Sequence, residues 1–470
     1  MPFILPANTL SAGGYAVANS CIFDRASTDS MSKSMSDGSS IKGTFSAWIK
    51  VDGTGNEMNI LSHFQDTSNV FSIATSGSSV YVVDYNSGYS LQLATNRIMR
   101  DPSAWFHLYV AIDRSQGTAN NRNRIFINGV EETSFSHRTN YGQQTSGGHQ
   151  DAISMNDGDC TMYLGGLGDG NQMFGGYLAE VVWLDGTASA VTNFGEFDED
   201  SGIFKPIDVS GLSSSKGTNG FYLDFEDASN LGNDAFGGTD LTESNIASTN
   251  QTTDTCTNNF STMNPLDNYY FGGTFSDGNL TVLSASSPFT YCTSTFGVGA
   301  GKWYIEAKWT SGSYLRFGIV HNPSTAVDDN PGNSAGEAVY RSDGAIVLNG
   351  TESGGYGSSF ASGDILSIAL DCDNSKIYFA KNGVYQASGV PANGTGGTTI
   401  TDVTTLPSGN YFFTFGDNAG SGTSTVSFNF GSPSFAISSS NADGNGYGNF
   451  EYAVPSGYYA LNTKNLAEYG

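Results

Sequence analysis

Short segments in which apolar and polar residues alternate recur along this chain, and they constrain its fold more than any other feature. In the first half they occupy residues 44–51, 70–74, 80–85, 105–113, 124–128 and 177–184. Each segment has the length of a β-strand, and alternation with a period of two is typical of a strand with one buried face. Glycine is abundant at 60 residues and supplies turns between strands. The pattern predicts antiparallel β-structure with few helices.

Asn-Gly turns join some of these segments. Asn128-Gly129 follows residues 123–127, and Asn382-Gly383 stands in the corresponding place in a second series of strands. Both central residues of a type I′ turn need a positive φ, which Asn and Gly tolerate best. We therefore predict a β-hairpin at each position.

The second series of alternating segments defines a second domain. It covers residues 301–309, 315–320, 363–371, 375–380 and 411–415. Because one hydrophobic core stops growing at roughly 250 to 300 residues, a chain of 470 residues needs at least two domains. We predict an all-β protein with two tandem antiparallel β-sandwiches of the jelly-roll type, over residues 1–209 and 264–470. The intervening residues 210–263, rich in Ser, Thr, Asn and Asp, are predicted to form a polar connector that carries one strand.

Charge and hydropathy exclude several classes of partner. The formal net charge is −26 with only 19 Lys and Arg, so no basic surface can neutralise the phosphates of nucleic acid. No apolar run approaches the ~18 residues of a membrane-spanning helix. The N-terminal segment lacks the basic residues of a secretory signal peptide. We expect a protein that is made in a cytoplasm, binds no nucleic acid and does not insert into a membrane.

Four strings in the first half follow one another in a characteristic order. They are Phe45-Ser-Ala-Trp-Ile-Lys50, Trp105-Phe-His-Leu-Tyr-Val-Ala-Ile-Asp113, Arg124-Ile-Phe-Ile-Asn-Gly-Val130 and Gly176-Tyr-Leu-Ala-Glu-Val181 with Trp183. In this order, residues 23–202 resemble the concanavalin A-like jelly roll of the laminin G and pentraxin type.

A second set of strings lies in the second half. It consists of Gly301-Lys-Trp-Tyr-Ile-Glu306, Ser342-Asp-Gly344, Gly363-Asp-Ile365, Lys376-Ile-Tyr-Phe-Ala-Lys-Asn-Gly-Val384 and Val426-Ser-Phe-Asn-Phe430. Through this set, residues 264–461 resemble a SPRY domain. Ligands of SPRY domains usually contact loops at one end of the sandwich, which the resemblance places at residues 322–341 and 349–362.

The pairing of the two modules carries a further resemblance. It includes the joining strings Phe221-Tyr-Leu-Asp-Phe225 and Asn258-Asn-Phe-Ser-Thr-Met-Asn-Pro265 and the terminal Tyr458-Tyr-Ala-Leu-Asn-Thr-Lys-Asn-Leu466. This arrangement resembles structural proteins of marine bacteriophages, either a tail fibre or a capsid-surface appendage. The resemblance implies a homo-oligomer on the virion surface that contacts other virion proteins and a host-surface glycan or receptor. A ligand-free decoration subunit and a polysaccharide-degrading glycosidase remain as alternatives.

Catalytic motifs are weak in this sequence. Glucanases of the concanavalin A-like class use Glu-x-Asp-x-x-Glu, and the nearest string is Glu196-Phe-Asp198 with Ser201 where the last Glu would stand. The five histidines and five cysteines show neither an HExxH nor a CxxC pattern, so we interpret them as structural or surface residues. We expect no enzymatic activity and no required cofactor.

Candidate ligand contacts are aromatic residues in Gly-rich or polar segments, since an exposed ring can stack on a sugar. They are Tyr141, Phe174, Tyr340 and Tyr356, together with Arg341 at the end of the first SPRY loop. Candidate calcium ligands flank residues 161–164, because Ca²⁺ takes oxygen ligands from such loops: Asp157, Asp159, Asp169 and Asn171. Calcium-dependent binding is a theme of laminin G and pentraxin modules. The alternative is that these four residues only form turns.

Overall fold

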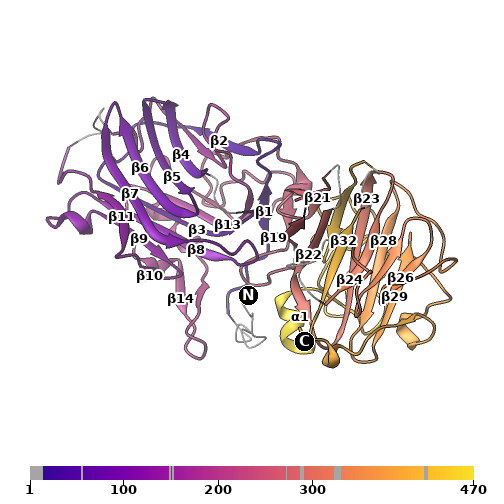
Figure 1. Ribbon diagram of the computed structural model, residues 1–470. Helices are drawn as coiled ribbons and strands as arrows, with labels where there is room; N and C mark the ends of the chain where they lie inside the picture. The colour runs from indigo at the N-terminus through magenta and orange to yellow at the C-terminus, as the bar shows by residue number, and fades with distance from the viewer. Residues whose placement is uncertain are drawn as a thin grey trace. The chain divides into compact units, whose positions relative to one another are not determined.

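The computed structural model describes residues 14–53, 57–147, 150, 153–270, 272–285, 290–321, 330–417 and 422–470. They form two compact units, of which the first ends at Thr257 and the second begins at Asn258 (Figure 1). Both units consist almost entirely of antiparallel strands. The predicted all-β fold is confirmed.

The first unit contains two large sheets and one separate hairpin. Sheet A has the strand order β10 (Val130–Glu131), β9 (Asn123–Ile127), β8 (Phe106–Asp113), β3 (Lys42–Val51), β13 (Gly176–Asp185), β1 (Ser20–Phe23), β18 (Gln251–Thr252), and β16 (Phe221–Leu223) also pairs with β13. Sheet B has the order β11 (Phe135–Thr139), β7 (Tyr89–Ile98), β6 (Ser79–Asn86), β5 (Asn69–Ser76), β4 (Met58–Asp66), β12 (Thr161–Leu164), β2 (Ser30–Ser34), β17 (Thr242–Ser244). The hairpin pairs β14 (Gly195–Phe197) with β15 (Phe204–Pro206).

The core of the first unit lies between sheets A and B. Alternate residues of β3 enter it, including Phe45 and Ile49, and they meet Phe71 and Ile73 of β5 from the other sheet. The opposite face of sheet A is also buried, because Trp48 packs on Phe204 of the hairpin with ring centroids 6.2 Å apart. Sheet A is therefore covered on both faces.

The structure draws the domain boundary at a different place from the predicted connector. Strands β16, β17 and β18 all come from residues 210–257, and they pair with β13, β2 and β1 of the first unit. The polar side chains of this segment bond to the sandwich: Asn250 Nδ2 donates to the Ile22 carbonyl at 2.9 Å, and Ser20 Oγ donates to the Asp254 carbonyl at 2.6 Å. The segment carries three strands and completes the first unit.

The second unit is a sandwich of two sheets. Sheet C has the order β19 (Met263–Tyr270), β22 (Thr290–Val298), β32 (Tyr411–Gly416), β24 (Arg316–Val320), β25 (Ala338–Arg341), β26 (Ile346–Leu348), β27 (Thr351–Ser353). Sheet D has the order β20 (Thr274–Ser276), β21 (Thr281–Leu283), β33 (Thr425–Asn429), β23 (Lys302–Ser311), β28 (Ile365–Asp371), β29 (Lys376–Lys381), β30 (Val384–Tyr385). Strand β31 (Thr398–Thr399) pairs with β29, and β34 (Tyr459–Ala460) runs parallel to β23. Phe428 of sheet D contacts Phe317 and Phe415 of sheet C, so the two sheets share one core.

The C-terminal residues cover the outer face of sheet D. Phe450 packs edge-on against Tyr304 with ring centroids 5.0 Å apart. The chain ends in helix α1 (Thr463–Tyr469), which begins at Asn462 because its side chain accepts a hydrogen bond from the Asn465 amide at 2.9 Å. Short 3-10 helices occur at Ala119–Asn121, Val191–Asn193, Ser210–Ser215, Ser248–Asn250, Pro391–Asn393 and Val403–Thr405. No helix in the described ranges has the length and apolar character needed to cross a bilayer.

Both predicted Asn-Gly hairpins are confirmed. Asn128 and Gly129 have φ of 51° and 75° between β9 and β10, and Asn382 and Gly383 have φ of 47° and 77° between β29 and β30. Two successive positive φ values are the requirement of a type I′ turn, whose twist matches that of the strands it joins.

Candidate functional site

Three of the predicted ligand-contacting aromatics lie in the interior. Tyr141, Phe174 and Tyr340 each have 0% of their surface exposed. Phe174 packs edge-on against Phe23, and Tyr340 packs against Phe360 at 4.9 Å between ring centroids. A ring without an exposed face cannot stack on a sugar, so the structure corrects this expectation for these three residues.

Tyr141 anchors a loop instead. Its hydroxyl donates to the buried carboxylate of Asp84 at 2.5 Å, and the backbone amides of Ser154 and Met155 donate to the same carboxylate at 3.1 Å. Burial raises the pKa of Asp84 to about 6. The network ties residues on either side of a loop to strand β6.

Tyr356 and Arg341 are only partly exposed. The Tyr356 ring lies against Tyr340 and Phe379, with centroid distances of 5.6 and 6.1 Å. The Arg341 guanidinium is paired with the carboxylates of Asp343 and Glu352. Hydrogen bonds from Arg341 are the main reason that the pKa of Asp343 is lowered. The Arg341 guanidinium therefore interacts with two carboxylates of the protein itself.

The four candidate calcium ligands form two separate turns. The Asp157 carboxylate accepts from the Asp159 amide at 2.9 Å, and the Asp169 carboxylate accepts from the Asn171 amide at 3.0 Å. The turns lie at opposite ends of strand β12, whose four residues span ~13 Å. Across the described ranges, no three His, Cys, Asp or Glu side chains are grouped so that they could hold a metal ion. The four residues therefore do not form a single site.

Asp198 shapes the tip of the β14–β15 hairpin. Its carboxylate accepts hydrogen bonds from the Ser201 amide at 2.9 Å and the Ser201 hydroxyl at 3.0 Å, which lower its pKa to about 2. Lys205 Nζ lies 3.3 Å from the carboxylates of both Glu196 and Asp198. A glycosidase needs one carboxyl whose pKa is raised so that it stays protonated, and the lowered pKa of Asp198 is the opposite of that requirement.

The buried histidines and cysteines are part of the packed interior. His63 accepts from the Asn156 amide at 3.0 Å, and His107 lies 2.8 Å from the Ser46 hydroxyl; burial lowers the pKa of each imidazole to about 3. The cysteines are free thiols, and burial raises the pKa of Cys160 to about 12. His149 lies outside the described residues.

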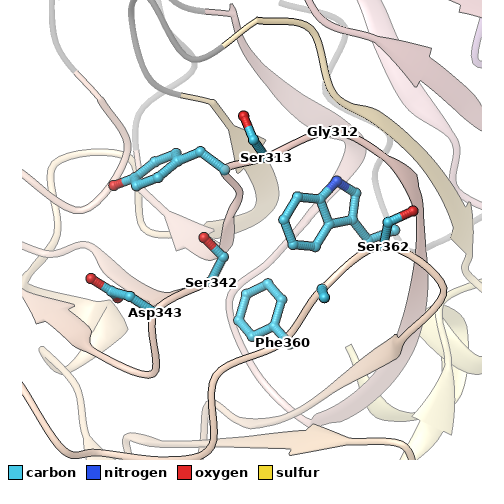
Figure 2. Close-up of a pocket in the computed structure, with 9 residues that line it drawn as sticks. Gly312, Ser313, Ser342, Asp343, Phe360 and Ser362 are labelled. Carbon is cyan, nitrogen blue, oxygen red and sulfur yellow. The ribbon is translucent and has the colours of Figure 1, made fainter.

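A pocket of about 400 Å³ opens at one end of the second sandwich. Three loops build it: the β23–β24 loop, the β25–β26 turn and the segment before β28. The lining residues are Trp309, Gly312, Ser313, Tyr314, Ser342, Asp343, Phe360, Ala361 and Ser362. Figure 2 shows the side chains of Ser313, Ser342, Asp343, Phe360 and Ser362 around the hollow.

Aromatic rings and tight backbone contacts hold the pocket in shape. Trp309 and Phe360 are 2% and 5% exposed and meet edge-on at 5.8 Å, so they form its buried apolar side. The Ser342 carbonyl accepts from the Phe360 amide at 2.9 Å, which joins two of the loops. Gly312 has a φ of 126°, and a Cβ there would lie 2.1 Å from Ser424 Oγ. Only glycine fits this position.

The pocket combines hydroxyl groups with aromatic surface. Ser313, Ser362 and Asp343 are exposed at its rim, while Tyr314 and Ser342 are partly buried. Such a site can hydrogen-bond a polar ligand and pack against its apolar face. The predicted loop 349–362 contributes Phe360, Ala361 and Ser362, whereas residues 322–329 of the other predicted loop lie outside the described residues. Sequence reasoning missed residues 312–314, although the Ser-Gly-Ser string after a strand is a loop signal.

Two protein-family models match the chain. Residues 25–191 match the model described as the concanavalin A-like lectin/glucanases superfamily, and residues 302–432 match the SPRY domain model. Both kinds of domain are typically binding or interaction modules rather than enzymes.

Individual relatives cover between 17% and 50% of the chain. The dual specificity protein kinase splA of Dictyostelium discoideum is 36% identical over 84 residues, which are 17% of this chain and 3% of the kinase. The crystal structure of the SPRY domain of human HERC1 is 17% identical with a TM-score of 0.29, and it covers 35% of this chain and 96% of that domain. A candidate carbohydrate binding protein of Bacteroides ovatus is 15% identical with a TM-score of 0.34, and it covers 50% of this chain and 60% of that one. The two family models show that the chain carries a concanavalin A-like domain followed by a SPRY domain, in that order.

Proposed function

We propose that this chain is a non-enzymatic binding protein whose SPRY domain holds its ligand in the Trp309–Phe360 pocket. The observation that carries the proposal is the combination in this pocket of two buried aromatic rings with the hydroxyls of Ser313, Ser342 and Ser362. Loops on a rigid sandwich are a common place for recognition, because the scaffold holds their side chains in position.

The ligand we propose is a group on a host-surface glycan or protein. The Ser362 hydroxyl donates to the Thr310 carbonyl at 2.6 Å, so it can only accept from a ligand. Serine hydroxyls and aromatic rings together suit an uncharged polar group with an apolar face. The Asp343 carboxylate at the rim is already paired with Arg341, through a hydrogen bond of 3.0 Å from Nε. This pairing reduces the charge that a ligand would meet.

We further propose that the chain is displayed as a homo-oligomer on a bacteriophage virion, as a tail fibre or capsid appendage. The support is the resemblance of the two-module arrangement and its joining strings to such proteins. Weak sites repeated on one particle gain avidity through effective concentration, which would suit a shallow pocket. The alternative is a decoration subunit that binds only other virion proteins.

Substitutions that place a large side chain at the rim of the pocket test the proposed binding site. The labelled chain is measured for binding to arrayed bacterial glycans and intact bacterial cells, beside Ser313→Trp and Ser362→Trp, which place an indole at the exposed rim. Ser439→Trp, at an exposed serine outside the pocket, is the control. Saturable binding that both rim variants abolish and the control retains supports the proposal. Binding that survives both rim variants would overturn it.

The proposed location on a virion is tested with purified phage particles. Mass spectrometry and immunogold microscopy of virions purified from the culture that produces the chain are expected to find it on the particle surface. Light scattering of the purified chain is expected to give a multiple of 49.5 kDa. Absence from purified particles would refute the virion assignment and leave the binding proposal standing.

A further inference from the structure

Asparagine is followed directly by glycine at six positions in this chain. The asparagines are Asn128, Asn219, Asn349, Asn382, Asn393 and Asn445. Such a pair is chemically reactive, because the backbone nitrogen of the second residue can attack the side-chain amide of the first, and glycine has no Cβ to shield that nitrogen. Each pair is therefore a candidate for spontaneous covalent modification, and the folded structure decides which of them can react.

Five of the six side chains are held by hydrogen bonds to other parts of the chain. The partners are the His107 amide for Asn128 (2.7 Å), the Ser36 carbonyl for Asn219 (2.7 Å), the Gly336 amide for Asn349 (2.7 Å), the Asp364 carboxylate for Asn382 (2.7 Å) and the Asn465 side-chain carbonyl for Asn445 (2.9 Å). Each of these bonds must break before the side-chain amide can turn towards the next backbone nitrogen, so each slows the reaction.

Asn393 differs from the other five asparagines. Within the described ranges, its side chain forms no hydrogen bond, and every residue from Ala392 to Gly396 is exposed. A Cβ built on Gly394 would meet nothing within 4 Å. The side chain is therefore free to turn, and the space around the Gly394 nitrogen is open to water.

One backbone hydrogen bond opposes the reaction at Asn393. The Gly394 amide donates to the Pro391 carbonyl at 3.0 Å and closes the single 3-10 turn Pro391–Asn393. Gly446 donates in the same way to the Asp443 carbonyl at 3.0 Å, so this bond does not distinguish the two sites. An isolated, exposed 3-10 turn opens at low cost, whereas the side-chain bonds of the other asparagines join them to the rest of their units.

We propose that Asn393 is a site of spontaneous modification, at which the folded chain converts asparagine to aspartate or isoaspartate. The Gly394 nitrogen bonds to Cγ of Asn393, the bond from Cγ to Nδ2 breaks, and Nδ2 leaves as ammonia with the amide proton of Gly394. Water then opens the cyclic imide. Cleavage at Cγ gives aspartate, and cleavage at the backbone carbonyl carbon gives isoaspartate. The reaction consumes water and needs no oxidant or cofactor.

Both products change the surface of the second unit. Each adds a carboxylate to a chain whose net charge is already −26. Isoaspartate also lengthens the backbone between Val390 and Thr395, where the Val390 amide donates to the Thr395 carbonyl at 2.8 Å. An extra atom inside this closed turn is expected to weaken that bond and to loosen the segment before β31. Asn393 does not line the Trp309–Phe360 pocket, so this inference is independent of the proposed binding function.

The test is peptide mapping by mass spectrometry after incubation of the full chain at mildly alkaline pH, folded and, in parallel, unfolded in urea. In the folded chain we expect Asn393 to lose its amide about tenfold faster than any other Asn-Gly asparagine, because the side-chain hydrogen bonds slow the others by roughly that factor. In urea all six are expected to react at similar rates, since the protection by folding is gone. Asn393→Gln is expected to remove the fast release of ammonia and to leave thermal unfolding unchanged.

Each outcome decides the proposal. Fast loss of the amide at Asn393 alone, with isoaspartate found among the products, supports it. An Asn393 that stays intact in the folded chain but reacts in urea would overturn it, because the 3-10 turn would then protect the site. Equal rates at Asn393 and Asn382 in the folded chain would also overturn it, since side-chain hydrogen bonds would then not decide the reactivity.

Discussion

The ammonium group of Lys50 lies 2.8 Å from the carboxylate of Asp254, and both side chains are almost completely buried. The same carboxylate accepts a hydrogen bond from Trp105 Nε1 at 2.9 Å. The pair joins strand β3 in sheet A to the segment that follows β18. It explains why residues up to Thr257 belong to the first unit.

Removal of one partner of this pair is expected to destabilise the first unit strongly. Asp254→Ala leaves the Lys50 charge buried without its counterion, which costs about 3–5 kcal/mol of the free energy of unfolding. Lys42→Ala breaks the more exposed pair with Asp113, 3.9 Å apart, and is expected to cost under about 1 kcal/mol. Urea unfolding followed by circular dichroism measures both. Equal losses would contradict a special role for the buried pair.

Glu180 is expected to make stability depend on pH. It stands at a bulge of β13 with a φ of 51°, and its carboxylate accepts from the Tyr222 hydroxyl at 2.8 Å and the Tyr15 hydroxyl at 3.3 Å. Burial raises its pKa from 4.5 to about 7. The folded state therefore holds this proton more tightly than the unfolded state. Its contribution is complete below pH 4.5 and is lost as the pH rises to 7, by up to about 1.4 kcal/mol per pH unit.

The matched variant for this pH effect is Glu180→Gln, which cannot ionise. Urea unfolding between pH 5 and 8 is expected to show a shallower decline for Glu180→Gln than for the unchanged chain. The pKa of Asp84 is also raised, so its contribution to stability falls with rising pH in the same way in both proteins. That contribution therefore cancels in the comparison. Parallel pH profiles would show that Glu180 does not titrate in this range.

Glu306 is expected to hold the C-terminal segment on sheet D. Its carboxylate accepts from the Tyr452 amide at 2.8 Å, the Glu451 amide at 2.9 Å and the Tyr304 hydroxyl at 2.9 Å. Glu306→Ala leaves these donors without their acceptor, so residues 432–470 should be cleaved faster in limited proteolysis followed by mass spectrometry. Glu352→Ala, at an exposed carboxylate, is the control. Unchanged cleavage in Glu306→Ala would show that packing alone holds the segment.

Gly129 is expected to tolerate no side chain. Its φ is 75°, and a Cβ there would lie 2.4 Å from the Phe204 ring. Gly77 also has a positive φ of 57°, but nothing lies within 4 Å of its added Cβ. Gly77→Ala therefore measures backbone strain alone, about 1 kcal/mol, and Gly129→Ala should cost clearly more by thermal unfolding. Similar losses would mean that Phe204 moves aside easily.

Local sequence patterns were sufficient for the strands and the two Asn-Gly hairpins. The positive φ of Asn128 and Gly129 depends on the turn itself, and the alternation in β3 or β23 depends on one residue and its next neighbours. Such features need no knowledge of distant contacts. For the same reason, the order of the two modules could be read from short strings.

The candidate site could not be predicted in this way. Tyr141 and Tyr340 stand in polar, Gly-rich surroundings in the sequence, yet both are buried, because other segments fold over them. The pocket beside Phe360 is assembled from three loops that are separated by up to 50 residues. No local sequence pattern shows which loops lie side by side in the folded domain.

The sequence by itself determined the all-β class, the positions of most strands and the presence of two modules, since these follow from side-chain periodicity and turn chemistry. Only the tertiary structure decided that residues 210–257 complete the first sandwich, that Trp309 lines an open pocket, and that Phe174 is buried. The physical reason is that burial depends on which surfaces pack together, and that packing is a property of the whole chain.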